Sequence, residues 1–336
     1  MQTALLILLV LVVAIDLVIV GVMARILILR RALMRIDAHQ TIMQDNNTIR
    51  GGLTYEEIEE TGVFIRRHTV EDGIERIVYT PKNKKYQTPL LFLHGMWHGA
   101  WCWQWWQELF AEWGWESHAF SLPGHGLSPE QRPIPQCTLD YYASFLKAEM
   151  GRFDSPPVLL GHSMGGAITQ WYLKYVRDDL PAVVLVASWV SHAAMVDGFK
   201  QFVKVDPLGT LVLTAIAGNA TPYIRSPKVA ARKLISQGAL LTPEELHARL
   251  GPESALVTIQ HNPPMWKPKD TVQAPVLYLA GNLDAVLSNS ASRKTAEHYG
   301  ADFIIIEKTA HNLMMEHNYR ETAEKIHAWL VVKGIA

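Results

Sequence analysis

The 336-residue chain has few of the features that mark specialised protein classes. Its two cysteines, Cys102 and Cys137, form at most one disulfide, so no disulfide framework is expected and buried free thiols are favoured. The formal net charge of -1 gives no reason to expect a nucleic-acid partner. The histidines show no H-E-x-x-H motif and no metal-ligand spacing with the cysteines, so we expect no metal and no cofactor.

Long apolar runs are absent except at the start of the chain. Between Thr3 and Ala24 the only charged residue is Asp16, and at about 1.5 Å per residue this stretch matches the hydrocarbon core of a bilayer. It is too long for a signal peptide, and no basic residue precedes it. The sequence therefore predicts a single-pass transmembrane helix within residues 1–37. The alternative is a helix buried in a homo-oligomer, because a carboxyl group inside a membrane usually faces a partner.

Basic residues follow this apolar stretch. They alternate with apolar residues at helical spacing as far as Met43, and they are Arg25, Arg30, Arg31 and Arg35. This pattern predicts an interfacial helix whose guanidinium groups reach lipid phosphates. The charge distribution favours a cytoplasmic catalytic domain but leaves the side of the membrane open. Residues 38–52 are predicted to be a linker.

The stretch from Pro157 to Gly166, P-V-L-L-G-H-S-M-G-G, is the centre of the chain. Its apolar run is typical of a strand buried on both faces of a parallel sheet, and helical spacing begins directly after Ser163. A serine between strand and helix, with glycines on both sides, is the G-x-S-x-G nucleophile elbow, whose sharp turn exposes the hydroxyl. The alternative is a glycine-rich turn that only ends a strand.

Two further strand ends supply partners for Ser163. A buried strand is predicted from Ala274 to Ala280, and Asp284 follows its carboxyl end, the edge where open parallel sheets place their active sites. A last strand from Phe303 to Ile306 precedes the loop that carries His311. We therefore predict Asp284 as the acid and His311 as the base of a catalytic triad.

Other interpretations of these residues stay open. Asp284 could merely cap a loop in an Asx turn, and Asp270 is a distant alternative acid, since it precedes its strand. His94 is expected to orient its loop, and His98 to line the pocket without a catalytic role. His311 is favoured as the base over both.

The residues after a predicted strand from Leu90 to Leu93 occupy the position of an oxyanion loop. Gly95 permits close approach of the backbone, so the N–H groups of Met96 and Met164 are predicted to stabilise an oxyanion. Trp97 and His162, which flank these positions, are predicted to contact the substrate.

Three motifs in this order resemble the α/β-hydrolase superfamily. They are the strand followed by His94-Gly95, the stretch L-P-G-H-G-L-S over 122–128, and G-H-S-M-G-G over 161–166. The likeness begins near Gly62 and continues to the C-terminus, and the whole chain resembles bacterial membrane-anchored esterases and lipases. The segment from His94 to Trp103 is also similar to the branch that contains plant methylesterases and hydroxynitrile lyases.

The resemblance implies an α/β-hydrolase fold, with a mostly parallel sheet, helices on both faces and a helical cap over the nucleophile. The core would comprise residues 53–190 and 271–336, and the cap residues 191–270. Apolar residues of the cap favour a hydrophobic substrate, although they could equally serve only to pack the cap onto the core. They are Phe199, Phe202, Val203, Leu211, Leu213, Ile216, Tyr223, Ile224, Met265 and Trp266.

The expected function is that of a membrane-anchored serine esterase or lipase, which cleaves small-molecule or lipid esters with hydrophobic acyl groups through an acyl-enzyme. The alternatives are a phospholipase or lysophospholipase of the same mechanism, a lyase of the same fold, and a non-catalytic ligand receptor. The expected partners are the ester substrate, membrane lipids and, through the N-terminal helix, a second copy of the chain.

The remaining patterns predict individual elements. Gly62 to Thr69 and Ile74 to Thr80 are predicted to form a hairpin at the sheet edge. Trp115 to Phe120 and Ala182 to Ala187 are predicted strands, and Leu139 to Met150 a helix. A capping box of Asn318 and Glu321 is expected to open the last helix.

Overall fold

The computed structural model describes residues 2–44, 54–192, 194–207, 209–210 and 220–335. A sheet of nine strands runs in the order β1-β2-β3-β5-β4-β6-β7-β8-β9. From β5 to β9 in this order every strand pair is parallel, whereas the pairs β1–β2, β2–β3 and β3–β5 are antiparallel. The predicted α/β class with a mostly parallel sheet is confirmed. The strands are β1 (Tyr55–Glu60), β2 (Phe64–Glu71), β3 (Ile74–Pro81), β4 (Tyr86–Leu93), β5 (Trp115–Phe120), β6 (Val158–His162), β7 (Val183–Val186), β8 (Val276–Gly281) and β9 (Asp302–Ile306).

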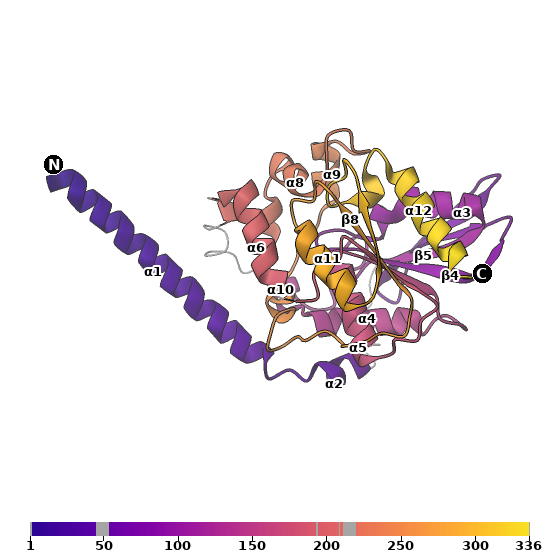
Figure 1. Cartoon of the computed structure of the whole chain (residues 1–336), viewed down its shortest axis with the longest axis horizontal. Helices are drawn as coiled ribbons and strands as arrows, with labels where there is room; N and C mark the ends of the chain where they lie inside the picture. Colours follow the sequence, from indigo (N-terminus) through magenta and orange to yellow (C-terminus); the bar gives the residue numbers. More distant parts are fainter. Residues whose placement is uncertain (1, 45–53, 193, 208, 211–219, 336) are drawn as a thin grey trace.

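Helices cover both faces of the sheet (Figure 1). Helix α3 packs against α12 on one face, and α4 packs against α5 on the other. The α-helices are α1 (Gln2–Leu33), α2 (Ala38–Met43), α3 (Gln104–Trp113), α4 (Leu139–Met150), α5 (Met164–Tyr175), α6 (Ala194–Val205), α8 (Pro227–Leu234), α9 (Pro243–Arg249), α10 (Leu256–Gln260), α11 (Asn289–His298) and α12 (Tyr319–Val332).

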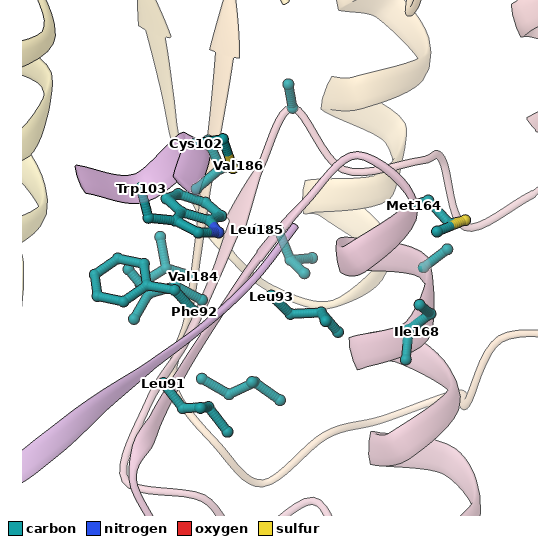
Figure 2. Close-up of a cluster of buried hydrophobic side chains, with 14 of the residues drawn as sticks. Leu91, Phe92, Leu93, Cys102, Trp103, Met164, Ile168, Val184, Leu185 and Val186 are labelled. Atoms are coloured by element: carbon teal, nitrogen blue, oxygen red, sulfur yellow. The ribbon is translucent and has the colours of Figure 1, made fainter. Parts of the chain in front are cut away.

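The centre of the sheet is buried on both sides, as its uninterrupted apolar strands predict. Figure 2 shows Phe92 of β4 lying with Trp103 on one side, and Leu93 pointing to the other side, toward Met164 and Ile168 of α5. The rings of Phe92 and Trp103 are 5.0 Å apart. Because successive side chains of a strand point to opposite faces, β4 anchors helices on both sides of the sheet.

The N-terminal prediction requires a correction. Within the described residues, no helix combines the length and the apolar character that crossing a bilayer requires. The predicted transmembrane helix in residues 1–37 and the single-pass membrane localisation are therefore wrong, and the side of the membrane inferred from them loses its basis. Asp16 interrupts the apolar stretch of α1 and is exposed, and a carboxylate at that depth of a bilayer is costly.

The helical pattern that was predicted to continue to Met43 is interrupted between Leu33 and Ala38. Helix α1 ends at Leu33, and α2 begins after Asp37, whose carboxylate accepts a hydrogen bond from the Gln40 N–H at 3.0 Å. Ile42 of α2 is fully buried, and α2 packs against α4. The first part of the predicted linker is therefore a helix that contacts the core, and residues 45–52 lie outside the described residues.

The edge of the sheet is β1, which the sequence did not predict. Its residues Y-E-E-I-E-E are nearly all exposed, so the strand has no buried apolar face to give a signal. Pairing with β2 holds it, together with charge pairs such as Arg66 to Glu57 at 3.3 Å. The predicted hairpin is present as β2 and β3, one strand in from the edge.

The segment between β7 and β8 is helical in its described part. We call residues 191–270 the cap segment. It contains α6, α8, α9 and α10 and a short 3-10 helix at Thr221–Ile224. Its predicted apolar residues Leu211, Leu213 and Ile216 lie outside the described residues.

The capping box expected at the start of α12 does not form. Asn318 occupies the N-cap position, but its side chain makes no capping hydrogen bond. Its amide instead donates to the Glu307 carbonyl at 3.1 Å and bonds the Thr309 hydroxyl at 2.8 Å. The asparagine therefore ties α12 to the loop after β9.

Candidate active site

Ser163 lies between β6 and α5 in a strained backbone conformation, with φ of 52° and ψ of -117°. Residues other than glycine rarely adopt such a positive φ, and holding one there costs about 1–3 kcal/mol. The packing of β6 and α5 must therefore maintain this conformation. The serine begins the helix at the positive end of its dipole, next to free N–H groups.

Gly165 shows why the elbow needs glycine. A Cβ at this position would lie 2.4 Å from the Leu93 carbonyl oxygen and 2.5 Å from that of His94, closer than any side chain tolerates. Both contacts are with backbone atoms, which cannot rotate away. The first turn of α5 is thus pressed directly against the end of β4.

The three residues predicted as a triad are adjacent in space, although they are far apart in the chain. His311 Nε2 lies 2.9 Å from Ser163 Oγ, and His311 Nδ1 lies 2.8 Å from Asp284 Oδ2. Each residue follows the carboxyl end of a parallel strand: Ser163 follows β6, Asp284 follows β8 and His311 follows β9. The sheet edge therefore assembles a continuous hydrogen-bonded chain from carboxylate to hydroxyl.

The loop after β8 leaves one carboxylate oxygen of Asp284 for His311. Oδ1 accepts the N–H groups of Val286 at 2.7 Å and Leu287 at 3.0 Å, which leaves Oδ2 facing the imidazole. A carboxylate can only accept, so Nδ1 carries the proton and Nε2 is left as an acceptor for the Ser163 hydroxyl. This is the arrangement that a general base requires.

Asp270, the alternative acid, lies elsewhere. Its carboxylate is largely exposed and forms a salt bridge of 3.6 Å with Lys267.

The loop after β4 runs against Ser163. A Cβ on Gly95 would lie 2.8 Å from the Ser163 Cβ, so only glycine allows the backbone to approach this closely. The next residue is Met96, and Met164 is the first residue of α5, where N–H groups have no acceptor within the helix. We call residues 94–98 the oxyanion loop, after the predicted role of the Met96 and Met164 amides.

Two buried histidines bond successive peptide groups of the oxyanion loop. His94 Nδ1 donates to the Gly95 carbonyl at 2.8 Å, and His98 Nδ1 donates to the Met96 carbonyl at 2.6 Å. Burial lowers the pKa of His94 well below its ordinary value and that of His98 to about 4. Both rings are therefore neutral at physiological pH and donate hydrogen bonds to the backbone. The sequence predicted this role for His94, whereas it predicted that His98 would line the pocket.

The two predicted substrate contacts, Trp97 and His162, are both buried. His162 Nε2 donates to the His311 carbonyl at 3.1 Å, and the two imidazole rings lie 4.9 Å apart. Trp97 has a positive φ of 66°, and its carbonyl accepts the Gly251 N–H at 2.7 Å. His162 thus contacts the candidate base, whereas Trp97 joins the oxyanion loop to the cap segment.

The cap segment also bonds the loops that carry the other candidate residues. On the His311 loop, Asn312 N–H donates to the Leu234 carbonyl at 2.9 Å, and the buried Glu316 carboxylate accepts the Ser236 N–H at 2.8 Å. After β8, Ser288 donates its hydroxyl to Asp197 of α6 at 2.7 Å. Sequence reasoning missed these contacts, because nothing in a local pattern identifies partners about 80 to 90 residues apart.

Ser163 is buried, with only 4% of its surface exposed. Across the described residues, no group of three or more His, Cys, Asp or Glu side chains is arranged to hold a metal ion. The candidate site brings together a serine hydroxyl, an imidazole and a carboxylate.

Comparison with known proteins agrees with this architecture. The model of the Alpha/beta hydrolase family matches residues 90–325, and the chain belongs to this family. Among curated proteins, the probable esterase PIR7A of Oryza sativa subsp. indica is 26% identical over 165 residues, which cover 46% of this chain and 62% of that protein. The chain therefore matches about three-fifths of the length of that relative.

Two solved structures show the extent of the shared fold. The monoacylglycerol lipase of Paleococcus ferrophilus has a TM-score of 0.57 at 20% identity, over 77% of this chain and 99% of that one. A structure described as a membrane phospholipase A has a TM-score of 0.59 at 19% identity, over 100% of both chains. At these identities the likeness is one of fold.

Proposed function

We propose that this protein is a serine carboxylester hydrolase, an esterase or lipase that works through an acyl-enzyme. The observation that carries the proposal is the unbroken chain from Asp284 Oδ2 through His311 to Ser163 Oγ, with distances of 2.8 and 2.9 Å. A glycine-rich turn that merely ended a strand would not need a histidine and a carboxylate in line with its serine. The names of related proteins, including a probable esterase, support the same class.

The first half of the reaction forms the acyl-enzyme. Ser163 Oγ attacks the ester carbonyl carbon while His311 Nε2 takes the hydroxyl proton, and Asp284 stabilises the imidazolium that results. The carbonyl oxygen becomes an oxyanion, held by the N–H groups of Met96 and Met164. His311 then gives its proton to the departing alkoxide, which leaves as an alcohol.

The second half repeats this chemistry with water as the nucleophile. His311 removes a proton from water as the water attacks the acyl-enzyme, and the same two amides hold the second oxyanion. Proton return to Ser163 Oγ releases a carboxylic acid and restores the hydroxyl. Loss of one oxyanion donor from such a site costs about 3 kcal/mol.

The substrate class that we propose is an ester with a hydrophobic acyl group, which binds beneath the cap segment (residues 191–270). The support for a hydrophobic acyl group is the apolar character of the cap segment. For example, Phe202 and Tyr223 pack against the hydrophobic core, with their rings 5.2 Å apart. A series of p-nitrophenyl esters of increasing chain length, run beside phospholipids and lysophospholipids, defines the preferred acyl length and the headgroup requirement.

The decisive test is covalent labelling with a fluorophosphonate. Wild-type protein should be labelled, and Ser163→Ala should not. Ser191→Ala is the matched control. The Ser191 hydroxyl also contacts a histidine, His192, at 2.6 Å, but no carboxylate among the described residues bonds that histidine. This variant should be labelled like the wild type. Absence of labelling in the wild type would favour a non-catalytic receptor. Release of an aldehyde or ketone in place of an acid would indicate a lyase.

A further inference from the structure

A buried hydrogen-bonded link joins the loop of the candidate base to the oxyanion loop. Asn312, the residue after His311, bonds His98 Nε2 through its side-chain nitrogen at 3.0 Å. His98 in turn donates from Nδ1 to the Met96 carbonyl at 2.6 Å. His98 and Asn312 are 1% and 0% exposed, so water does not compete for either bond.

The hydrogen positions in this link follow from its ends. The Met96 carbonyl only accepts, so His98 Nδ1 carries a proton and, in the neutral ring, Nε2 is an acceptor for the Asn312 amide. The Asn312 nitrogen also lies 3.4 Å from the Met315 sulfur, a second weak acceptor. The reversed amide would need a doubly protonated His98, a buried cation without a carboxylate. One protonation pattern therefore fits both hydrogen bonds of the link, while the buried Asn312 Oδ1 has no hydrogen-bond partner among the described residues.

Both ends of the link are fixed by other contacts. The Asn312 N–H donates to the Leu234 carbonyl at 2.9 Å, and its carbonyl accepts the Met315 N–H at 3.0 Å. At the other end, the planar peptide group that contains the Met96 N–H is held through the Gly95 carbonyl by His94. His98 fixes the next peptide group, so the two histidines together define the direction of the Met96 N–H.

We propose that His98 and Asn312 are positioning residues, which set the Met96 amide relative to the base loop so that oxyanion donor and general base act on one carbonyl. This inference rests on the proposed hydrolase function and deepens it. Neither side chain reacts. Oxyanion donors lie about 2.7–3.1 Å from the oxyanion, and a displacement of about 1 Å can cost a hundredfold in rate.

The test uses four variants of the full chain. His98→Ala removes the link, and Asn312→Leu leaves His98 Nε2 unpaired. His98→Asn restores a donor at the position of Nδ1 and hence the bond to Met96. His261→Ala is the control for losing a buried histidine, since His261 bonds Trp171 at 3.0 Å and the Val190 carbonyl at 3.1 Å, outside the oxyanion loop.

For His98→Ala we expect kcat on a short p-nitrophenyl ester to fall about tenfold to a hundredfold with KM nearly unchanged. Affinity for a trifluoromethyl ketone, which forms an oxyanion adduct with the serine, should fall by a similar factor. Asn312→Leu should show a smaller loss, His98→Asn should recover most of the activity, and folded His261→Ala should match the wild type. Equal kcat and equal ketone affinity in folded His98→Ala would overturn the proposal.

A second measurement keeps the inference separate from the hydrolase proposal. Nitrogen-15 NMR of the imidazoles should show His98 as the Nδ1-protonated neutral tautomer in the wild type, and Asn312→Leu should shift its Nε2 resonance. An Nε2-protonated or charged His98 would refute the link even in an active enzyme. If the wild type neither hydrolyses esters nor reacts with the fluorophosphonate, the hydrolase proposal fails and this NMR result alone decides whether the link exists.

Discussion

The two sides of Ser163 are built in different ways. On the core side, backbone atoms leave no free space, as the 2.4 Å gap between a Cβ added at Gly165 and the Leu93 oxygen shows. On the cap side, a few hydrogen bonds connect the cap segment to each loop, for example Gly251 N–H to the Trp97 carbonyl at 2.7 Å. Close backbone packing in the core thus fixes the position of Ser163. Hydrogen bonds from the cap segment position the loops, and each of these bonds can be removed separately by mutation.

The largest effect is expected at the core side, from Asp284→Asn. The amide nitrogen would face His311 Nδ1 and favour the tautomer that cannot accept the serine proton, so kcat should fall by about 10⁴. Steady-state kinetics on a short ester measures this. Asp270→Asn, at an exposed carboxylate, should be unaffected. Equal losses in both variants would show that Asp284 is not the acid.

Two glycine substitutions compare the packing of the two sides. Gly165→Ala should lower the free energy of unfolding by about 3 kcal/mol, because its Cβ meets backbone. Gly198→Ala, in cap helix α6, meets nothing within 4 Å and should raise that free energy by up to about 1 kcal/mol. Thermal and urea denaturation give both values. Wild-type stability in the Gly165→Ala variant would contradict the tight elbow.

Serine caps test whether a cap-to-core attachment matters beyond stability. Ser288 caps α11 and bonds Asp197, whereas Ser226 caps α8 within the cap segment. Each alanine variant should lose about 1 kcal/mol of stability. Only Ser288→Ala should also lower kcat, since its loop carries Asp284. Identical kinetics for the two variants would mean that the α6 attachment does not influence the site.

The smallest change is expected in the pH dependence of stability at Glu316. Burial raises the pKa of this carboxyl above its ordinary value of 4.5. A raised pKa means that its contribution to stability is fully present below that value and is lost as pH rises through the folded-state pKa. Urea denaturation at a series of pH values from 4.5 upward should therefore show that the free energy of unfolding of the wild type falls relative to that of Glu316→Gln as pH rises. Parallel pH profiles would contradict this.

The core side could be predicted from the sequence because its constraints are local. Strand β5 and helix α4 have the predicted bounds, since each has a clear apolar period. The arrangement of Ser163, Asp284 and His311 follows from three strand ends meeting at one sheet edge. The G-x-S-x-G motif from Gly161 to Gly165 indicated the sharp turn between β6 and α5 that carries Ser163.

Other features depend on distant partners and left no local signal. His98 and Asn312 are 214 positions apart, on the loops that follow β4 and β9 of the same sheet. Asn318 and Glu321 fit a capping pattern, but Thr309 and Glu307 offered the asparagine other partners. An apolar first stretch suggested a membrane span, which no helix within the described ranges supports.

The unusual backbone angle of Ser163 has a consequence for protein engineering. Glycine adopts φ of 52° without steric strain, and relief of about 1–3 kcal/mol of strain exceeds the entropic cost of glycine, so Ser163→Gly is expected to make the protein more heat-resistant while abolishing turnover. Selection for thermal tolerance alone would then enrich inactive sequences. Any directed-evolution campaign on this scaffold needs to score catalysis in every round.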